Sequence, residues 1–418
     1  MRFTVVTYGS EGDTRPLVAL CRGLMDARHE VQLFTEQSTL GSARALGVPV
    51  AALAGELQSI LRLDDPLREL SRRDVLKTFA QSLRLVNENT ASWMRSVSEH
   101  ARSSDAILFA GLASVTGRTV AQALHKPAIN LCLQPTSATR EFLSPVLPPM
   151  RMPAWVNRLS YGVSPNALMA FLYGKATRAA RDEIFGRGEY GGSFADQFPI
   201  LYGFSAHLVK RPDDWPESHL ITGHWPLPPV DWQAPHELLE FLAAGPPPIY
   251  VGFGAMSSFF RREALGEITT AIAGRRALFY PGWSKISAAM LPDNMFVIDS
   301  IPHSWLFPRT SAVIHHAGAG TTHSAARAGV PSIALPVAVD QFYWAARLAG
   351  AGVAPKYIRA AKIDAKTLAG MLEFTAQDSV RERAQALGAA MAQEQGVPRA
   401  VTAIEALVGT GGAATGDA

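Results

Sequence analysis

The stretch that most constrains this chain is Val313-Ile-His-His-Ala-Gly-Ala-Gly-Thr-Thr322. Its branched apolar start is typical of a buried parallel strand, and two histidines follow where that strand should end. A loop of alanines and glycines then leads into a helix that opens at Thr321 and ends before Gly329. A helix N-terminus behind a glycine loop directs free N–H groups and the positive end of its dipole at one point. We therefore predict an anion site; an ordinary tight strand-to-helix connection is the plainer alternative.

The length and composition of the chain indicate two soluble domains. Its 418 residues suit two hydrophobic cores, and 48% hydrophobic with 18% charged residues is typical of a globular protein. A net charge of +3 gives no support for a nucleic-acid partner. Cys21 and Cys132 have no metal-site spacing, and neither a signal peptide nor a spanning apolar run is evident. We expect a cytoplasmic monomer or homodimer with at most peripheral membrane contact.

The first half alternates short apolar runs with helical segments. Strands are predicted at residues 2–7, 29–35 and 106–110, and the first helix at residues 17–28 after a loop at 8–16. Two amphipathic helices, interrupted at Pro66, are predicted at residues 59–85, and a further helix at residues 87–102. This alternation indicates a doubly wound α/β domain. The first loop holds Gly9 and Gly12 as GxxG rather than GxGxxG, which argues against a dinucleotide-binding dehydrogenase.

The second half repeats the pattern after a proline-rich stretch. Residues 226–247 contain many prolines around a short helix, which is typical of a stiff linker. From residue 248 a strand, a glycine loop and further strands predict a second α/β domain. We therefore expect an N-terminal domain at 1–225, a linker at 226–247, a C-terminal domain at 248–380, and a helical segment at 381–418 that is broken near Gly396 and frays at its end.

Two regions of the sequence resemble one known family. The segment 313–322, extended through 327–331 and 336–345 and upstream through 291–308, resembles the donor-diphosphate signature of the UDP-glycosyltransferase superfamily (glycosyltransferase family 1). The similarity is to its sterol-glucosyltransferase-like and antibiotic glycosyltransferase branch. Residues 9–20, GSEGDTRPLVAL, resemble the opening of the same branch. The resemblance implies the GT-B fold: two doubly wound Rossmann-like domains that face each other across a cleft, with the C-terminal helix packed back on the first domain.

The resemblance assigns a role to Asp13. Taken alone, an Asp beside a helix N-terminus is most often a capping residue. In the family, the matching Asp takes the proton from the acceptor hydroxyl, and an alcohol needs such a base to become a good nucleophile. Asp13 can be both cap and base. The plant enzymes carry a His near this point, which this loop lacks. Ser10 and Gly12 are expected beside the acceptor.

The resemblance also implies a donor site on the second domain. Backbone near Ile301 is expected to meet the nucleobase, the segment 316–322 to hold the diphosphate, and Asp340 with Gln341 to bind the sugar hydroxyls. The predicted donor-binding residues are Gly254, Ser257, Trp283, Ile301, His303, His316, Gly318, Gly320, Thr321, Asp340 and Gln341.

Two features of this predicted donor site stay open. The family's usual serine is replaced by Ala255, so Ser257, Ser258 or backbone N–H groups are the candidate substitutes. Trp283 suits a nucleotide contact and a structural role equally well. The sequence shows no acidic metal motif, so no metal cofactor is expected, and the glycine loop with His316 would neutralise the leaving diphosphate.

The proline-rich and apolar stretch after residue 134 resembles the family's variable acceptor wall. Any one of its apolar residues is more often simply part of a core. As a set they predict a wide apolar pocket lined by Phe142, Trp155 and Tyr161.

The expected activity is an inverting transfer of a sugar, glucose in most of the branch, from a UDP- or dTDP-sugar to a lipophilic alcohol such as a sterol, macrolide or polyketide. Two alternatives are a catalytically silent GT-B partner protein and a nucleotide-sugar epimerase. The presence of Asp13 argues against the first, and the predicted acceptor wall argues against the second.

Overall fold

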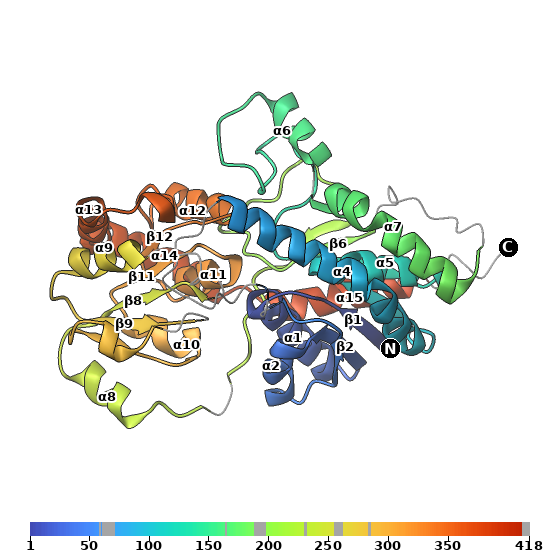
Figure 1. The fold of residues 1–418 in the computed structure, drawn as a ribbon, viewed down its shortest axis with the longest axis horizontal. Coiled ribbons are helices and arrows are strands. Elements are labelled where there is room, and N and C mark those ends of the chain that lie inside the picture. The colour runs from blue at the N-terminus through green and yellow to red at the C-terminus, as the bar shows by residue number, and fades with distance from the viewer. Residues whose placement is uncertain are drawn as a thin grey trace.

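Two parallel sheets organise the chain (Figure 1). The seven-stranded sheet has the order β3-β2-β1-β4-β5-β6-β7, and the five-stranded sheet has the order β10-β9-β8-β11-β12. The predicted architecture of two doubly wound α/β halves is confirmed. The computed structural model describes residues 1–57, 60, 72–163, 165–187, 198–229, 232–254, 262–282 and 286–411.

The strands are short and mostly buried, as expected for parallel sheets covered by helices on both faces. The first sheet consists of β1 (Arg2–Val6), β2 (Glu30–Glu36), β3 (Val50–Leu53), β4 (Ala106–Phe109), β5 (Ala128–Cys132), β6 (Ile200–Tyr202) and β7 (His219–Ile221). The second consists of β8 (Ile249–Gly252), β9 (Ala277–Tyr280), β10 (Met295–Val297), β11 (Ala312–His315) and β12 (Ser332–Ala334).

Helices cover both sheets and link them. Those of the first half are α1 (Glu11–Asp26), α2 (Leu40–Ala45), α4 (Arg72–Ala101), α5 (Ser114–Ala123), α6 (Ala154–Ser160) and α7 (Pro165–Phe185). Those that follow are α8 (His236–Ala243), α9 (Arg262–Ile272), α10 (His303–Leu306), α11 (Ala319–Arg327), α12 (Gln341–Gly350), α13 (Ala365–Ala376), α14 (Asp378–Ala392) and α15 (Gly396–Gly411).

Each sheet reverses its strand order at one point, and these points position the site. The first sheet reverses between β1 and β4, and the second between β8 and β11. In open α/β sheets, ligands bind beyond the carboxyl ends of the strands at such reversals, because the loops there diverge to opposite faces. Gly254 and His316 lie in the loops that follow β8 and β11, and Asp13 lies in the first turn of the helix that follows β1.

The helix boundaries correct two expectations. Helix α1 begins at Glu11 instead of residue 17, and Pro16 lies inside it. The Ser10–Asp13 capping box starts the helix early, so Asp13 belongs to its first turn. Residues 72–101 form one helix, α4, where a new helix was expected at residue 87; this stretch contains no Gly or Pro to interrupt it. The helices predicted around Pro66 lie outside the described residues.

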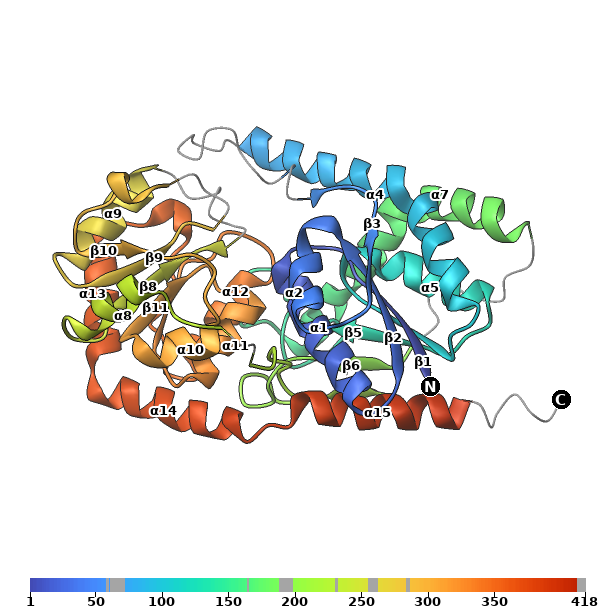
Figure 2. The same ribbon diagram turned by 90° about the horizontal axis from the view of Figure 1, so that it is seen from below.

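The last two helices run along both halves of the molecule (Figure 2). Helix α14 lies under the second half, and α15 continues under the first. Ala400, Val401 and Ile404 of α15 are buried in the same apolar cluster as Leu17 and Leu20 of α1. Residues 396–408 are thus part of the core of the first half, although they follow the second half in sequence.

Two further features of the described residues bear on expectations from the sequence. Cys21 and Cys132 are both buried free thiols. None of the helices in the described part of the chain is both long and apolar enough to cross a bilayer.

Candidate active site

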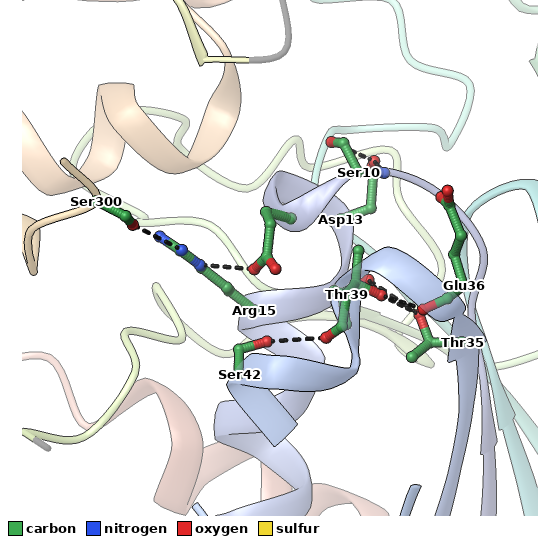
Figure 3. Close-up of polar contacts among 10 residues, drawn as sticks. Ser10, Asp13, Arg15, Thr35, Glu36, Thr39, Ser42 and Ser300 are labelled. Carbon is green, nitrogen blue, oxygen red and sulfur yellow. Dashed lines mark hydrogen bonds and ion pairs between the residues drawn. The ribbon is translucent and has the colours of Figure 1, made fainter. Parts of the chain in front are cut away.

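The Asp13 side chain is held by the loop that precedes its own helix (Figure 3). Its Oδ2 atom accepts hydrogen bonds from the Ser10 backbone N–H at 2.8 Å and from the Ser10 hydroxyl at 2.9 Å. A Cβ atom at Gly9 would lie 2.5 Å from the same oxygen, so only glycine lets the carboxylate fold against the loop. Both bonds from Ser10 are made to the same carboxylate oxygen of Asp13.

A buried cluster of threonine hydroxyls fixes the helix turn that carries Asp13. The Oγ1 atoms of Thr14 and Thr35 lie 3.1 Å apart, and that of Thr39 lies 3.0 Å from Thr35. Thr14 is in the first turn of α1, whereas Thr35 is the last residue but one of β2. Figure 3 shows Thr35 and Thr39 beside the start of α1. These contacts tie the start of α1 to the sheet edge, and no pattern in the sequence pointed to them.

The surroundings of Asp13 shift its pKa in two opposite directions. The residue is half-buried. Burial raises the pKa of Asp13 above its ordinary value, and the hydrogen bonds from Ser10 act in the opposite direction. A carboxylate with a raised pKa and a fixed orientation accepts a proton more readily than one in water.

Glycines from two strand ends surround His316 in the second half. A Cβ at Gly318 would lie 2.5 Å from the Nε2 atom of His316, and one at Gly254 would lie 3.7 Å from its Cε1 atom. A Cβ at Gly282 would in turn lie 2.4 Å from the Gly254 carbonyl oxygen, a close approach that the sequence did not indicate. Between His316 and Gly318, Ala317 adopts a φ of 63°, an uncommon conformation for a residue other than glycine.

The histidines of this loop are neutral at physiological pH. Burial lowers the pKa of His316 to about 4. Burial, with the neighbouring His316 and His303, lowers the pKa of His315 to about 3. The Nδ1 atom of His315 accepts a bond from the Ala317 N–H at 3.1 Å, so its proton lies on Nε2. Within the described residues, the buried Nδ1 atom of His316 has no hydrogen-bond partner.

Helix α11 begins at this loop with Gly318 as its N-cap. Its first turn contains Gly320 and Thr321, both half-buried. A Cβ at Gly320 would meet nothing within 4 Å, so open space lies beside this turn. The buried Thr322 hydroxyl lacks a partner among the described residues. The unpaired N–H groups of this turn can bind an anion.

Asp340 and Gln341 begin α12 and point in different directions. The Oδ2 atom of Asp340 accepts a bond of 3.0 Å from the indole N–H of Trp344, one turn further along the helix. The Gln341 side chain turns back, and its Oε1 atom accepts bonds from the backbone N–H groups of Val337 at 2.7 Å and Ala338 at 3.1 Å. Gln341 therefore shapes its own loop and has only its amide NH₂ left to donate.

The loop before Asp340 carries a second uncommon backbone conformation. Val339 has a φ of 53° and is 56% exposed. This conformation is strained for a β-branched residue, and such strain is often found at functional sites. The position of Trp344, four residues after Asp340 on a helix, was the sequence signal that would have revealed its hydrogen bond.

The two halves meet where these residues lie. The Arg15 guanidinium, bonded to Glu11 at 2.8 Å, reaches the Ser300 hydroxyl of the other half at 3.4 Å (Figure 3). Burial raises the pKa of Asp340 to about 6, and the negative charge of Asp13 adds to that rise. The charge of Asp13 therefore reaches Asp340, although the two residues follow strands of different sheets.

Two other predicted donor residues follow β10. Ile301 is 7% exposed and belongs to an apolar cluster of the second half. His303 opens α10 and stacks on Phe307, with ring centroids 4.2 Å apart. Burial, with the charge of Arg15, lowers the pKa of His303 to about 3. Ser257 and Trp283 lie outside the described residues.

The predicted acceptor residues are dispersed. Ser10 and Gly12 lie next to Asp13, with Gly12 exposed. The Phe142 ring packs on Tyr343 of α12, with centroids 5.5 Å apart, and Tyr161 is 5% exposed. Trp155 lies on α6 with 66% of its surface exposed. Of the apolar trio, Phe142 alone has a described ring contact with the second half.

Comparisons with known proteins agree with this geometry. Residues 279–407 match a family model described as the erythromycin biosynthesis protein CIII-like C-terminal domain. The chain is 31% identical over 427 residues to O-mycaminosyltylonolide 6-deoxyallosyltransferase of Streptomyces fradiae, with 97% of each chain covered. It is 27% identical over 417 residues to a sterol 3-beta-glucosyltransferase of Arabidopsis thaliana, with 96% of this chain and 67% of that protein covered. The similarity to the Aspergillus clavatus sterol 3-beta-glucosyltransferase spans 29% of that longer protein.

Solved structures share the fold at low identity. The calicheamicin glycosyltransferase CalG4 aligns with a TM-score of 0.69 at 17% identity over 98% of both chains. The glycosyltransferase VinC, solved in complex with dTDP, aligns with a TM-score of 0.67 at 17% identity, over 98% of this chain and 100% of that one. With two facing sheets and a close full-length relative, the chain belongs to glycosyltransferase family 1, as a GT-B enzyme that uses nucleotide-sugar donors and small-molecule acceptors.

Proposed function

We propose that the enzyme transfers glucose, with inversion, from a nucleotide donor to a hydroxyl of a lipophilic alcohol, and that Asp13 is the general base. One observation carries this proposal. The Asp13 carboxylate is held by Ser10 at a strand-order reversal of the first half and is an electrostatic neighbour of Asp340 from the second half. A base and a sugar-binding carboxylate from different halves are what a reaction between two separately bound substrates needs.

The reaction then proceeds as a single displacement. The free oxygen of Asp13 takes the proton of the acceptor hydroxyl as that oxygen bonds to the anomeric carbon. The bond between the anomeric carbon and the diphosphate breaks, and its electron pair leaves with the nucleotide. Because the nucleophile attacks the face opposite the leaving group, the anomeric configuration inverts.

The second half is proposed to stabilise the leaving diphosphate. The first turn of α11 offers unpaired N–H groups beside Gly320, where space is open. The neutral His316 ring, set between Gly254 and Gly318, can donate one further hydrogen bond. Hydrogen-bond donors that are already in position stabilise the negative charge that develops on the diphosphate as its bond to the sugar breaks. Asp340 would accept hydrogen bonds from the sugar hydroxyls. The hydrogen bond that it accepts from the Trp344 indole keeps its carboxylate oriented.

The relatives support the choice of a lipophilic alcohol. Their names specify sterols and O-mycaminosyltylonolide as acceptors, and glucosyl or 6-deoxyallosyl groups as the sugars. These acceptors share a hydroxyl on a bulky apolar body. We propose glucose as the sugar because two of the three sequence relatives named above are glucosyltransferases.

The test is a transfer assay with two donors. Purified enzyme is incubated with UDP-glucose or dTDP-glucose and a panel of sterols, macrolide aglycones and polyketide alcohols, and product mass and free nucleotide are measured together. We expect a hexose added to at least one acceptor, and a β-linked product from the α-linked donor by NMR. An α-linked product would refute inversion. Nucleotide release without glycoside would refute the transfer of glucose to these alcohols.

A further inference from the structure

One short segment of the first half exposes an unusual number of large apolar side chains. Met150, Met152, Trp155 and Leu159 are 62%, 39%, 66% and 65% exposed. They are half of the eight large hydrophobic side chains that are exposed within the described residues. Single exposed apolar residues are common on proteins, but a cluster marks an interaction surface. We call these four residues the α6 apolar face.

Helix α6 is oriented with its polar side inward. Asn157 is 5% exposed, and its Nδ2 atom donates to the Arg140 carbonyl oxygen at 2.8 Å. Trp155 and Leu159 are four residues apart, so they share the opposite, outer side of the helix. A helix that packs on a protein core normally buries its Trp and exposes its Asn. In α6 the Asn is buried and the Trp is exposed.

The segment is fastened at its base, so the apolar face keeps its orientation. Asp214 accepts bonds from the Thr139 hydroxyl at 2.6 Å and from the Arg140 N–H at 2.9 Å. The Ser160 hydroxyl accepts from the Ser144 N–H at 2.8 Å and donates to the Asn157 carbonyl at 2.6 Å. Figure 1 shows α6 standing above the junction of the two halves, apart from both sheets. These bonds hold α6 outward instead of letting it collapse onto the body.

The segment that carries the apolar face has two charged side chains, Arg151 and Arg158, and no acidic residue between positions 150 and 160. The charge of Arg158 also acts on Asp214 at the base of the segment. Both arginines are exposed. Guanidinium groups pair well with phosphates, and Trp prefers the boundary between headgroups and hydrocarbon. A protruding apolar tip flanked by cations has the chemistry of an interfacial anchor on an anionic bilayer.

We propose that the α6 apolar face, with Arg151 and Arg158, docks the enzyme on membranes that contain anionic lipids. A bilayer is favoured over a folded partner because the surface protrudes, and a lipid surface needs no matching groove. The insertion is shallow, since α6 has only seven residues. This proposal goes beyond the transferase reaction and does not depend on the identity of the acceptor.

The experiment is co-sedimentation of the whole enzyme with vesicles of phosphatidylcholine, alone or mixed with phosphatidylglycerol. We expect the wild-type protein to partition preferentially to the anionic vesicles. The double variant Trp155→Ser/Leu159→Ser should bind them at least about tenfold more weakly, since two apolar side chains no longer enter the lipid. Arg151→Gln/Arg158→Gln should lose the preference for phosphatidylglycerol.

A matched variant removes exposed apolar side chains elsewhere. Leu239→Ser/Met290→Ser alters two residues that are 46% and 45% exposed, and it should bind vesicles like the wild type. Thermal unfolding of all variants checks that they fold. The proposal is overturned if the wild type ignores both vesicle types, or if both apolar double variants bind equally well. It is also overturned if light scattering shows that the wild type is a dimer and that Trp155→Ser/Leu159→Ser is a monomer, because the α6 apolar face would then join two copies of the chain.

Discussion

The negative charge of Asp13, in the first half of the molecule, acts on the carboxyl group of Asp340 in the second half. Burial, and in addition the negative charge of Asp13, raises the pKa of Asp340 to about 6. Each residue is oriented by its own helix, Asp13 through Ser10 and Asp340 through Trp344. The reaction proposed above needs both, one at the acceptor and one at the sugar, and the predictions below separate their roles.

Replacing Asp13 with Asn should stop transfer and leave donor binding intact. The amide keeps the shape of the carboxylate but cannot take a proton, so kcat should fall by roughly 10²–10⁴-fold. Donor affinity, measured by calorimetry with UDP or dTDP, should stay within about twofold because the donor belongs to the other half. Asp26→Asn, in the last turn of the same helix and paired with Arg22, is the control and should behave as wild type. If Asp13→Asn lost both donor affinity and thermal stability, the role of Asp13 would be that of a structural helix cap.

Adding a methyl group at Gly9 should act on Asp13 without altering its chemistry. The new Cβ would lie 2.5 Å from the Asp13 Oδ2 atom, so the carboxylate must turn away from its position. We expect Gly9→Ala to lower kcat by about 10²-fold, the scale on which small misplacements reduce rates. Gly41→Ala is the matched control, since its Cβ would meet nothing within 4 Å. Equal activity of the two variants would show that the orientation of Asp13 is unimportant.

His316→Ala should weaken donor binding. A hydrogen bond to a charged diphosphate contributes about 1.5–3 kcal/mol, which corresponds to a loss of roughly 10–100-fold in affinity. Because burial lowers the pKa of His316 to about 4, the ring is neutral from pH 6 to 8, and its contribution should be constant there. His236→Ala on α8, whose side chain is 83% exposed, serves as the control. Unchanged affinity in the His316 variant would remove the diphosphate assignment.

Gly320→Ala should stabilise the fold and still lower the affinity for the nucleotide-sugar donor. Alanine is favoured over glycine inside a helix by about 1 kcal/mol, and no protein atom opposes its Cβ at this position. The melting temperature should therefore rise. If the diphosphate lies against this turn, the methyl group should obstruct it and lower affinity by about tenfold or more. Higher stability with unaltered donor affinity would place the diphosphate elsewhere.

Asp340→Asn should raise stability at neutral pH. The folded-state pKa of about 6 exceeds the ordinary value of 3.8, so the folded protein holds the Asp340 proton more tightly than the unfolded chain does. The ionisation of Asp340 at pH 7 thus disfavours the folded state. An Asn at this position cannot ionise, so the free energy of unfolding should increase by up to about 3 kcal/mol.

This gain should shrink as pH falls from 6 towards 4 and vanish below that, where wild-type Asp340 is protonated in both states. Denaturant unfolding at pH 7 and pH 4 measures it. Asp364→Asn, at the N-cap of α13, is the comparison: hydrogen bonds from Thr367 lower the pKa of Asp364, so this variant should bring no gain. The same gain at both pH values would contradict the charge explanation. Donor affinity should fall in Asp340→Asn if the carboxylate binds sugar hydroxyls.

Much of the fold was determined by local sequence. Alternating apolar runs and helical segments predicted two parallel sheets, because buried strands and amphipathic helices leave distinct periodic patterns. The glycine loop at 313–322 predicted a strand end and a helix start, and β11 and α11 follow that order. Pro16 misled the prediction of α1, since the capping box at Ser10 outweighs a proline further along the helix.

The tertiary structure decided what these local features do together. Nothing near Asp13 in sequence reveals that its charge acts on Asp340, or that Thr35 and Thr39 contact the start of its helix, because these relationships depend on how distant elements pack. Gln341 turns toward its own loop, and Trp155 lies on an outward helix instead of among buried aromatic residues. Local sequence specifies strands, helices and their ends through backbone preferences and periodicity. The two half-sites are brought together by helices and side chains of one half that contact the other, and no local pattern encodes those contacts.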